Sequence, residues 1–207
     1  MSSSAPTIVF LAVAIYISVG FLEQSALPSF LAHVALLSNR SASPDDVSHA
    51  VTSHMGICSL SLGVMAVIVA GWAGRLSDLF GRRLMAFLPA IAQAAAVAFL
   101  SVAAFLELGW QYTAVAWALQ GLCGGPFVFL AAAFAYLADH KRDRQAGERG
   151  RAFSMLDSML LLVASVGPLV GSALVARVGY AGAFAACSLV YTAAALVFVL
   201  APPSPQV

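Results

Sequence analysis

The ten residues GRLSDLFGRR, at positions 74–83, decide the fold class of this chain. They place three arginines and one aspartate between two long apolar stretches, residues 55–72 and 84–106. Charged groups are costly near hydrocarbon, so a compact charged segment between two such stretches indicates a loop that joins two membrane spans.

The composition indicates that most of the chain is surrounded by lipid. Of the 207 residues, 61% are hydrophobic and 9% are charged, whereas a soluble domain has about 25% charged residues. The net charge of +1 does not favour a nucleic-acid partner. Cys58, Cys123 and Cys187 all lie in apolar stretches, so we expect no disulfide.

Six apolar segments follow one another along the chain, and each is long enough to cross a bilayer, which takes about 20 residues. They cover residues 7–36, 51–79, 84–106, 110–138, 152–176 and 179–201. We therefore predict an all-α, polytopic membrane protein with six transmembrane helices in a single domain, residues 1–207. The longest segments must tilt or kink, and Pro28 and Pro126 are candidate kink sites. Residues 39–48 are expected to form a polar loop.

The basic residues predict the orientation of the chain. Eight of the ten lie in or beside the two connections at 74–83 and 139–151, and the other two are Arg40 and Arg177. Basic residues collect on the cytoplasmic side of a membrane. Both connections and both termini are therefore expected to be cytoplasmic, in the plasma membrane or in an internal membrane.

The segment at 74–83 resembles the loop between the second and third helices of major facilitator superfamily transporters, whose pattern is G-x-L-x-D-x-x-G-R-[RK]. The fixed positions are met by Gly74, Leu76, Asp78, Gly81, Arg82 and Arg83. The residues themselves indicate that Gly74 allows another helix to approach, that Gly81 permits a tight turn, and that Asp78 and Arg82 can pair. The resemblance implies a cytoplasmic gate that also uses the acid at the end of the fourth helix, here Asp139. The alternative is that these charges only fix the topology.

Two further motifs place the chain within this resemblance. The run SVGPLVGSALV resembles the Gly-Pro motif of antiporters through Gly167, Pro168 and Gly171, although Ser172 replaces the last glycine of that motif. The Gly-Pro pair predicts a local kink with close packing. The run WALQG keeps Gln120 of a pattern found in proton-coupled members, but Trp117 stands where that pattern has arginine. The overall pattern is similar to the tetracycline-efflux and folate-type branches.

Two acids, Glu23 and Asp157, lie inside predicted spans. A carboxyl group in a low dielectric favours its neutral form, so each is a candidate proton carrier. Gln24 and Gln120 are further candidates for substrate or proton coupling. A structural hydrogen bond is the alternative role for Glu23, and an ion pair with a loop arginine is the alternative for Asp157. The resemblance places the first, second, fourth and fifth helices around a central cavity and the third and sixth outside it.

Together these observations predict a secondary active transporter of a small organic solute, coupled to protons and working by alternating access. The superfamily fold has two six-helix halves, so we expect this chain to be the first half and to need a C-terminal half or a second copy. The alternative is a six-span scaffold or regulator that transports nothing. No hydrolase or metalloprotease motif is present, so we expect no catalytic residues, no metal and no cofactor.

Overall fold

The computed structural model describes residues 4–39, 41–140 and 146–200, and every element in these ranges is a helix. Inside them, the side chains of residues 4–8, 21, 78, 140, 146–149, 152 and 160 are outside the description. The helices are α1 (Ser4–Ser38), α2 (Pro44–Phe80), α3 (Arg82–Phe105), α4 (Gln111–Leu122), α5 (Gly125–His140) and α6 (Ala146–Leu200).

Five helical stretches are long and apolar enough to cross a membrane. They are Val9–Ser38, Pro44–Ser77, Arg82–Phe105, Gln111–Asp139 and Phe153–Leu200. The predicted all-α class is therefore confirmed, together with several membrane-spanning helices. The exact number of six spans and the single-domain boundaries stay predictions.

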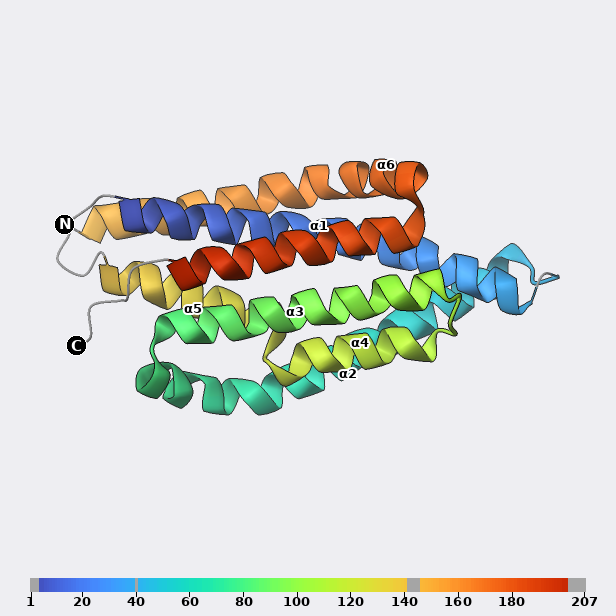
Figure 1. The fold of residues 1–207 in the computed structure, drawn as a ribbon, viewed down its shortest axis with the longest axis horizontal. Coiled ribbons are helices and arrows are strands. Elements are labelled where there is room, and N and C mark those ends of the chain that lie inside the picture. The colour runs from blue at the N-terminus through green and yellow to red at the C-terminus, as the bar shows by residue number, and fades with distance from the viewer. Residues whose placement is uncertain (1–3, 40, 141–145, 201–207) are drawn as a thin grey trace.

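The last of these stretches is 48 residues long and reverses direction. Gly179 interrupts α6 with φ 72° and ψ 176°, a backbone conformation that is essentially restricted to glycine. Figure 1 shows the two arms of α6, orange and red, running in opposite directions from this point. The predicted segments 152–176 and 179–201 lie on the two arms.

The predicted segment 110–138 is broken in the middle. Helix α4 ends at Leu122 and α5 begins at Gly125, with Gly124 and Gly125 at φ 81° and 54°. Pro126 follows in the first turn of α5, where its missing N–H costs no hydrogen bond. Pro126 thus starts a new helix, whereas α1 continues through Pro28.

Helix α2 begins earlier than we predicted, because residues 44–48 are helical rather than part of the polar loop. Ser43 and Asp46 form a capping box, in which the Ser43 hydroxyl accepts from Asp46 N and the Asp46 carboxylate accepts from Ser43 N. Pro44 stands at the start of the helix, and Asp45 and Asp46 are in its first turn. These are strong signals for a helix N-terminus, and they outweigh the polar composition of the segment.

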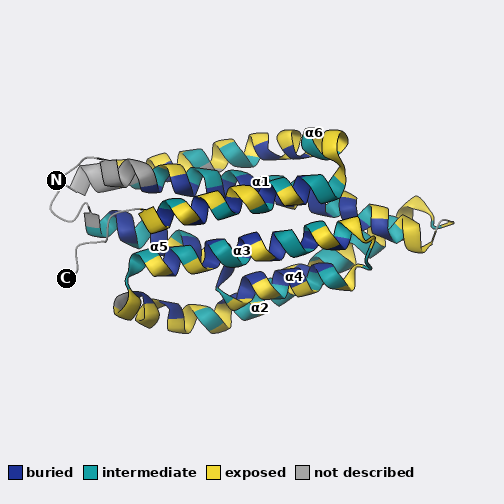
Figure 2. Ribbon diagram, viewed as in Figure 1, coloured by how far each residue is buried: buried dark blue, intermediate teal, exposed yellow. Residues whose placement is uncertain are grey.

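The bundle is centred on α6 and α3. Helix α6 packs along both α1 and α3, while α2 packs mainly against α4. Half of the most apolar window of α3 is buried, but only 11% of the corresponding window of α2 is buried. Figure 2 shows α2 mostly exposed. One side of this helix is therefore free to meet lipid or another protein.

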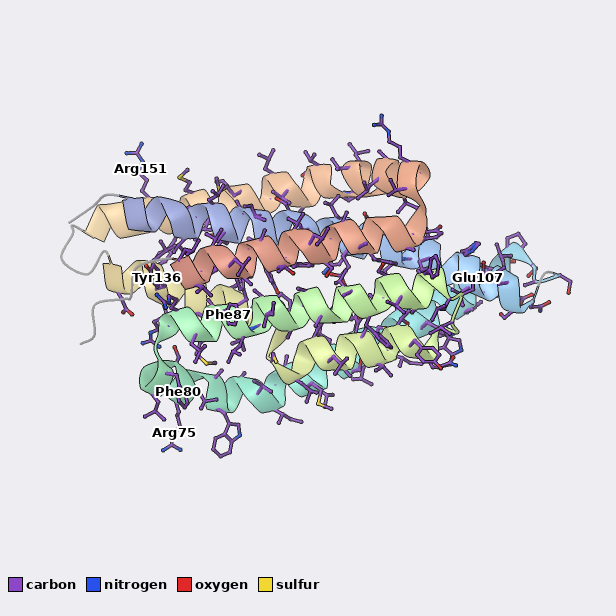
Figure 3. The ribbon with its side chains drawn as sticks, in the orientation of Figure 1. Arg75, Phe80, Phe87, Glu107, Tyr136 and Arg151 are labelled. Atoms are coloured by element: carbon purple, nitrogen blue, oxygen red, sulfur yellow. The ribbon has the colours of Figure 1, made fainter. Side chains whose placement is uncertain are left out.

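The two ends of the bundle differ in the charged residues that they carry. Figure 3 shows Arg75 and Arg151 near one end and Glu107 at the other. The first turns of α1 and the last turns of α6 lie at the arginine end. The helix ends that flank both basic connections, the start of α1 and the end of α6 therefore lie at the same end of the bundle.

Candidate functional site

A buried carboxyl group lies inside the bundle on α1. Glu23 is 3% exposed, and its carboxylate accepts three hydrogen bonds from three other helices. Gln93 Nε2 of α3 donates to Oε2 over 2.8 Å, and the Tyr191 hydroxyl of α6 donates to the same oxygen over 3.1 Å. Gln120 Nε2 of α4 donates to Oε1 over 3.0 Å. The site therefore ties four helices to one carboxyl group.

This carboxyl group borders a cavity of about 130 Å³. Polar and aromatic side chains from α1, α3, α4 and α6 line it, namely Tyr16, Glu23, Gln93, Trp117, Gln120 and Tyr191. No lysine, arginine or histidine of the described chain is among the lining residues. Every donor to Glu23 found in the described chain is thus neutral.

The break between α4 and α5 lies at this cavity. Gln120 is in the last turn of α4, Pro126 is in the first turn of α5, and both line the cavity. Transporter binding sites are often built where a membrane helix is discontinuous, because the interrupted backbone there lines a cavity rather than facing lipid. The glycines at 124 and 125 make this interruption possible.

The structure brings together some of the predicted site residues and separates others. Glu23 and Gln120 are hydrogen-bonded, and Gln24 is exposed at the edge of the same cavity. Asp157 is exposed on α6 and does not line the cavity. The alternative role of Asp157, an ion pair with a loop arginine, is not found among the described side chains, and the loop at 141–145 is outside them.

Sequence reasoning missed two direct partners of Glu23. Gln93 and Tyr191 lie on the third and sixth predicted spans, to which no part in the cavity was given. A signal was available for Gln93, because it is the one amide side chain in the apolar stretch 84–106. A buried amide requires a hydrogen-bonding partner, and an intramembrane acid is a suitable one.

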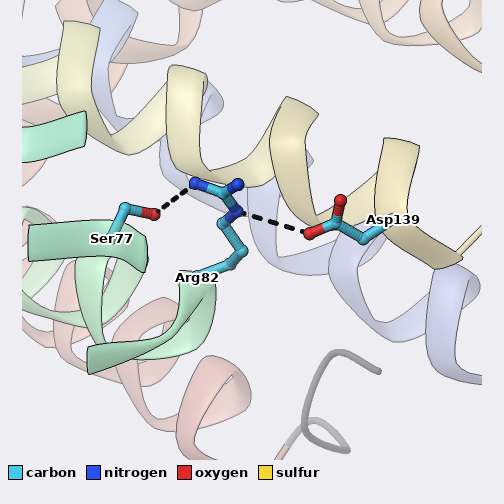
Figure 4. Close-up of polar contacts among 3 residues, drawn as sticks. All are labelled: Ser77, Arg82 and Asp139. Carbon is cyan, nitrogen blue, oxygen red and sulfur yellow. Dashed lines mark hydrogen bonds and ion pairs between the residues drawn. The ribbon is translucent and has the colours of Figure 1, made fainter. Parts of the chain in front are cut away.

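A second polar cluster lies where α2, α3 and α5 meet. Arg82 Nε is 3.3 Å from Asp139 Oδ2, and Arg82 Nη1 donates to the Ser77 hydroxyl over 2.9 Å. Figure 4 shows the guanidinium group between the two partners. The Arg82 and Asp139 side chains are about a quarter exposed, at 29% and 26%. The pair connects the turn between α2 and α3 to the end of α5.

The turn itself depends on Gly81. This residue alone separates α2 from α3, with φ 88° and ψ 150°, and its N–H donates to Ser77 O over 3.0 Å. A residue with a Cβ atom is strained in this conformation. The positive φ at Gly81 is the conformation that the predicted tight turn would use.

Among the remaining residues of the motif at 74–83, Gly74 and Leu76 are exposed. A Cβ atom at Gly74 would meet nothing within 4 Å. No helix of the described chain therefore uses Gly74 for a close approach. Arg83 is half-buried and has interactions of its own. The Asp78 side chain lies outside the described residues, so its pairing with Arg82 stays a prediction.

The Gly-Pro motif lies on the first arm of α6. The helix continues through Pro168, since Gly179 is its one non-helical position. Gly171 is buried against α1, where a Cβ atom would lie 3.0 Å from Leu22 O. The predicted close packing is present at Gly171.

The geometry agrees with a comparison between this chain and protein families. A family model described as Major Facilitator Superfamily matches residues 6–207. The chain belongs to the major facilitator superfamily. No individual curated protein matches it. This major facilitator protein is therefore an integral membrane protein of a transporter family. Its two candidate functional clusters are the hydrogen-bonded group around Glu23 and the pair of Arg82 and Asp139.

Proposed function

We propose that this protein is a secondary active transporter of a small organic solute, driven by a proton gradient, and that Glu23 carries the coupled proton. The supporting observation is the burial of the Glu23 carboxyl group beside a cavity with only neutral donors around it. Glu23 is the one carboxyl group that is buried among the described side chains.

The charge of this carboxyl group provides the physical basis for coupling. A buried carboxylate without a cationic partner is unstable, so a proton or a positive group has to accompany it. Its three hydrogen bonds hold it in position across α1, α3, α4 and α6. Movement of any of these helices would change the environment of the carboxyl group, which is what coupling requires.

We propose that the contact between Arg82 and Asp139 is part of a cytoplasmic gate that opens and closes during alternating access. It joins α3 to the end of α5, so it resists separation of these helices at that end. This assignment places both termini and the arginine end of the bundle in the cytoplasm, in agreement with the basic residues at positions 75 and 151.

A second six-helix unit is proposed to complete the transporter, either further along the same polypeptide or as a second copy. Gln24 and Asp157 lie in stretches long and apolar enough to span a membrane, are exposed, and have side chains that make no hydrogen bond to another described side chain. Such groups are expensive in hydrocarbon, so they are expected to face protein or a water-filled cavity.

The test is a transport assay that does not require the substrate to be known. Proteoliposomes containing the protein are incubated with a mixture of cell metabolites, with and without an imposed pH gradient, and their contents are analysed by mass spectrometry. Compounds that accumulate only with the gradient, and not with the Glu23→Gln variant, support the proposal. Accumulation that is equal without the gradient contradicts proton coupling. Absence of any accumulation above that of empty liposomes contradicts transport.

A further inference from the structure

Three buried polar atoms around the Glu23 cavity lack a hydrogen-bonding partner within the described chain. They are Tyr16 Oη, Gln93 Oε1 and Trp117 Nε1. The three residues are 3%, 6% and 6% exposed, and all three line the cavity. Buried polar atoms in proteins are nearly always hydrogen-bonded, so a cluster of unpaired ones at a cavity indicates a binding site for a polar ligand.

The unpaired atoms define the hydrogen-bonding groups of that ligand. Gln93 Oε1 can only accept, so it requires a donor on the ligand. Trp117 Nε1–H can only donate, so it requires an acceptor. The Tyr16 hydroxyl can do either. A ligand that satisfies all three therefore carries both an N–H or O–H donor and an acceptor oxygen.

The charge of the site indicates the charge of the ligand. Glu23 supplies one carboxylate, and the described lining residues include no basic side chain. The rings of Tyr16, Trp117 and Tyr191 also line the cavity, and aromatic rings attract cations. The donor that meets Gln93 is then best placed on a positively charged nitrogen.

The cavity is partly open, and its volume limits the size of the group that it can hold. The cavity measures about 130 Å³, slightly less than the roughly 150 Å³ of an engineered protein cavity that holds benzene. The site therefore accepts a small molecule, or one group of a larger molecule, of about the size of a six-membered ring.

We propose that this cavity recognises an organic cation of this size that has a protonated amine and a hydroxyl or carbonyl oxygen. The inference rests on the proposed function, because it names the substrate class of the same site. The ammonium group pairs with the Glu23 carboxylate and donates to Gln93, while the oxygen accepts from Trp117. When Glu23 is protonated beforehand, binding releases that proton to solvent, and the cation replaces its positive charge.

A matched pair of probes tests the charge requirement. Binding of 3-hydroxypiperidine and of cyclohexanol to the purified protein is measured by titration calorimetry, in two buffers that differ in ionisation enthalpy. The two compounds have the same ring size and a hydroxyl group, and the first is a cation at neutral pH. We expect the cation to bind at least about tenfold more tightly, with proton release, and this preference to be lost in Glu23→Gln. Equal binding, preference for cyclohexanol, or no saturable binding of 3-hydroxypiperidine would overturn the proposal.

A tryptophan variant tests the oxygen requirement. Trp117→Phe removes the indole N–H and keeps an aromatic ring, so it should weaken binding of 3-hydroxypiperidine but not of piperidine, which lacks the hydroxyl group. Trp72→Phe, at a residue that is 64% exposed, is the control and should change neither. Equal weakening of both compounds would show that Trp117 acts only through packing. Thermal unfolding of each variant verifies that it is folded.

The failure of this inference can be distinguished from the failure of the proposed function. If the proteoliposomes accumulate neutral or anionic compounds with the pH gradient, the substrate class is wrong and proton-coupled transport stands. If they accumulate cations equally with and without the gradient, the substrate class stands and proton coupling is wrong.

Discussion

Gln93 Nε2 lies 2.8 Å from Glu23 Oε2, although 70 residues separate the two in sequence. The contact crosses from α3 to α1 and is shared with the Tyr191 hydroxyl, which donates to the same oxygen over 3.1 Å. Because all of these groups are buried, the geometry of the carboxyl group depends on the relative positions of three helices. Substitutions at this cluster are therefore the most direct tests of the proposals.

Replacing Glu23 by glutamine should abolish accumulation driven by a pH gradient. The amide has nearly the same shape but cannot exchange a proton, so coupling is lost while the fold is kept. The measurement compares accumulation in proteoliposomes with and without the gradient, at equal amounts of protein.

The control for this variant is Glu107→Gln, which makes the same chemical change at an exposed position in the turn after α3. It should transport as the wild type does. Gradient-driven accumulation in Glu23→Gln that matches the control would exclude Glu23 as the proton carrier.

Tyr191→Phe and Gln93→Leu should each lower thermal stability, and their effects should not add. Each removes one hydrogen bond to Glu23 Oε2, which is worth about 0.5–1.5 kcal/mol, or about 1.5–3 kcal/mol when the acceptor is charged. Residues that share one acceptor commonly show coupling of about 0.5–3 kcal/mol.

A double-mutant cycle in detergent measures this coupling, with Tyr180→Phe as the control. Tyr180 packs near Phe30 and is not among the donors to Glu23 in the described chain, so its variant should be additive with Gln93→Leu. Additivity in the Tyr191 cycle as well would mean that the two donors act independently.

The sequence was sufficient for the all-α class and for the family. The charged segment at 74–83 and the basic residues are local signals, and Arg82 and Asp139 do approach each other as the resemblance implied. The turn at Gly81 is also local, since one residue sets the backbone angles. Such features need no knowledge of how the helices pack.

The surroundings of Glu23 could not be predicted in the same way. Which faces of α3 and α6 are turned towards Glu23 depends on packing among many similar apolar residues, so Gln93 and Tyr191 could not be assigned to Glu23 from spacing alone. An irregularity near Pro126 was predicted, but the full break at Gly124 and Gly125 was not, because an apolar stretch containing glycines is also compatible with one continuous span. Only the three-dimensional arrangement shows that this break borders the cavity.

Asp139→Asn should favour the conformation that is open at the gate end. The ion pair with Arg82 is partly exposed, and such pairs contribute up to about 1 kcal/mol. A change of this size shifts a two-state equilibrium about fivefold. The readout is the rate at which a water-soluble maleimide labels Ala132→Cys. Ala132 is buried and lines a second pocket, separate from the Glu23 cavity, that is also lined by Arg82.

Asp45→Asn is the matched control for the gate, because Asp45 is exposed in the first turn of α2. Labelling of Ala132→Cys should be unchanged in this background. Labelling that is equally slow in the Asp139→Asn background would indicate that the ion pair only helps to fix the topology.

Gly179→Ala should destabilise the protein by about 1–3 kcal/mol through backbone strain. A Cβ atom at this position would meet nothing within 4 Å, so a steric clash cannot be the cause. Thermal unfolding in detergent measures the effect. Gly71→Ala, inside α2 and also without neighbours, should be neutral or slightly stabilising. If the two variants have equal melting temperatures, the positive φ at Gly179 is contradicted.

Gly121→Ala should weaken the packing between α4 and α2 and disturb the Glu23 site. A Cβ atom at Gly121 would lie 2.6 Å from Met65 Cβ and 2.9 Å from Leu62 O, and neither atom is the end of a flexible side chain. Relieving such overlap typically costs about 1–3 kcal/mol. Because Gly121 follows Gln120, a shift of α4 would also lengthen the hydrogen bond from Gln120 to Glu23, which is 3.0 Å long. The melting temperature and the rate of gradient-driven transport should therefore both decline. The control is Gly63→Ala on α2, where the added Cβ atom would meet nothing within 4 Å, and it should retain both. Loss of stability with full transport in Gly121→Ala would show that Gln120 does not need its present position for coupling.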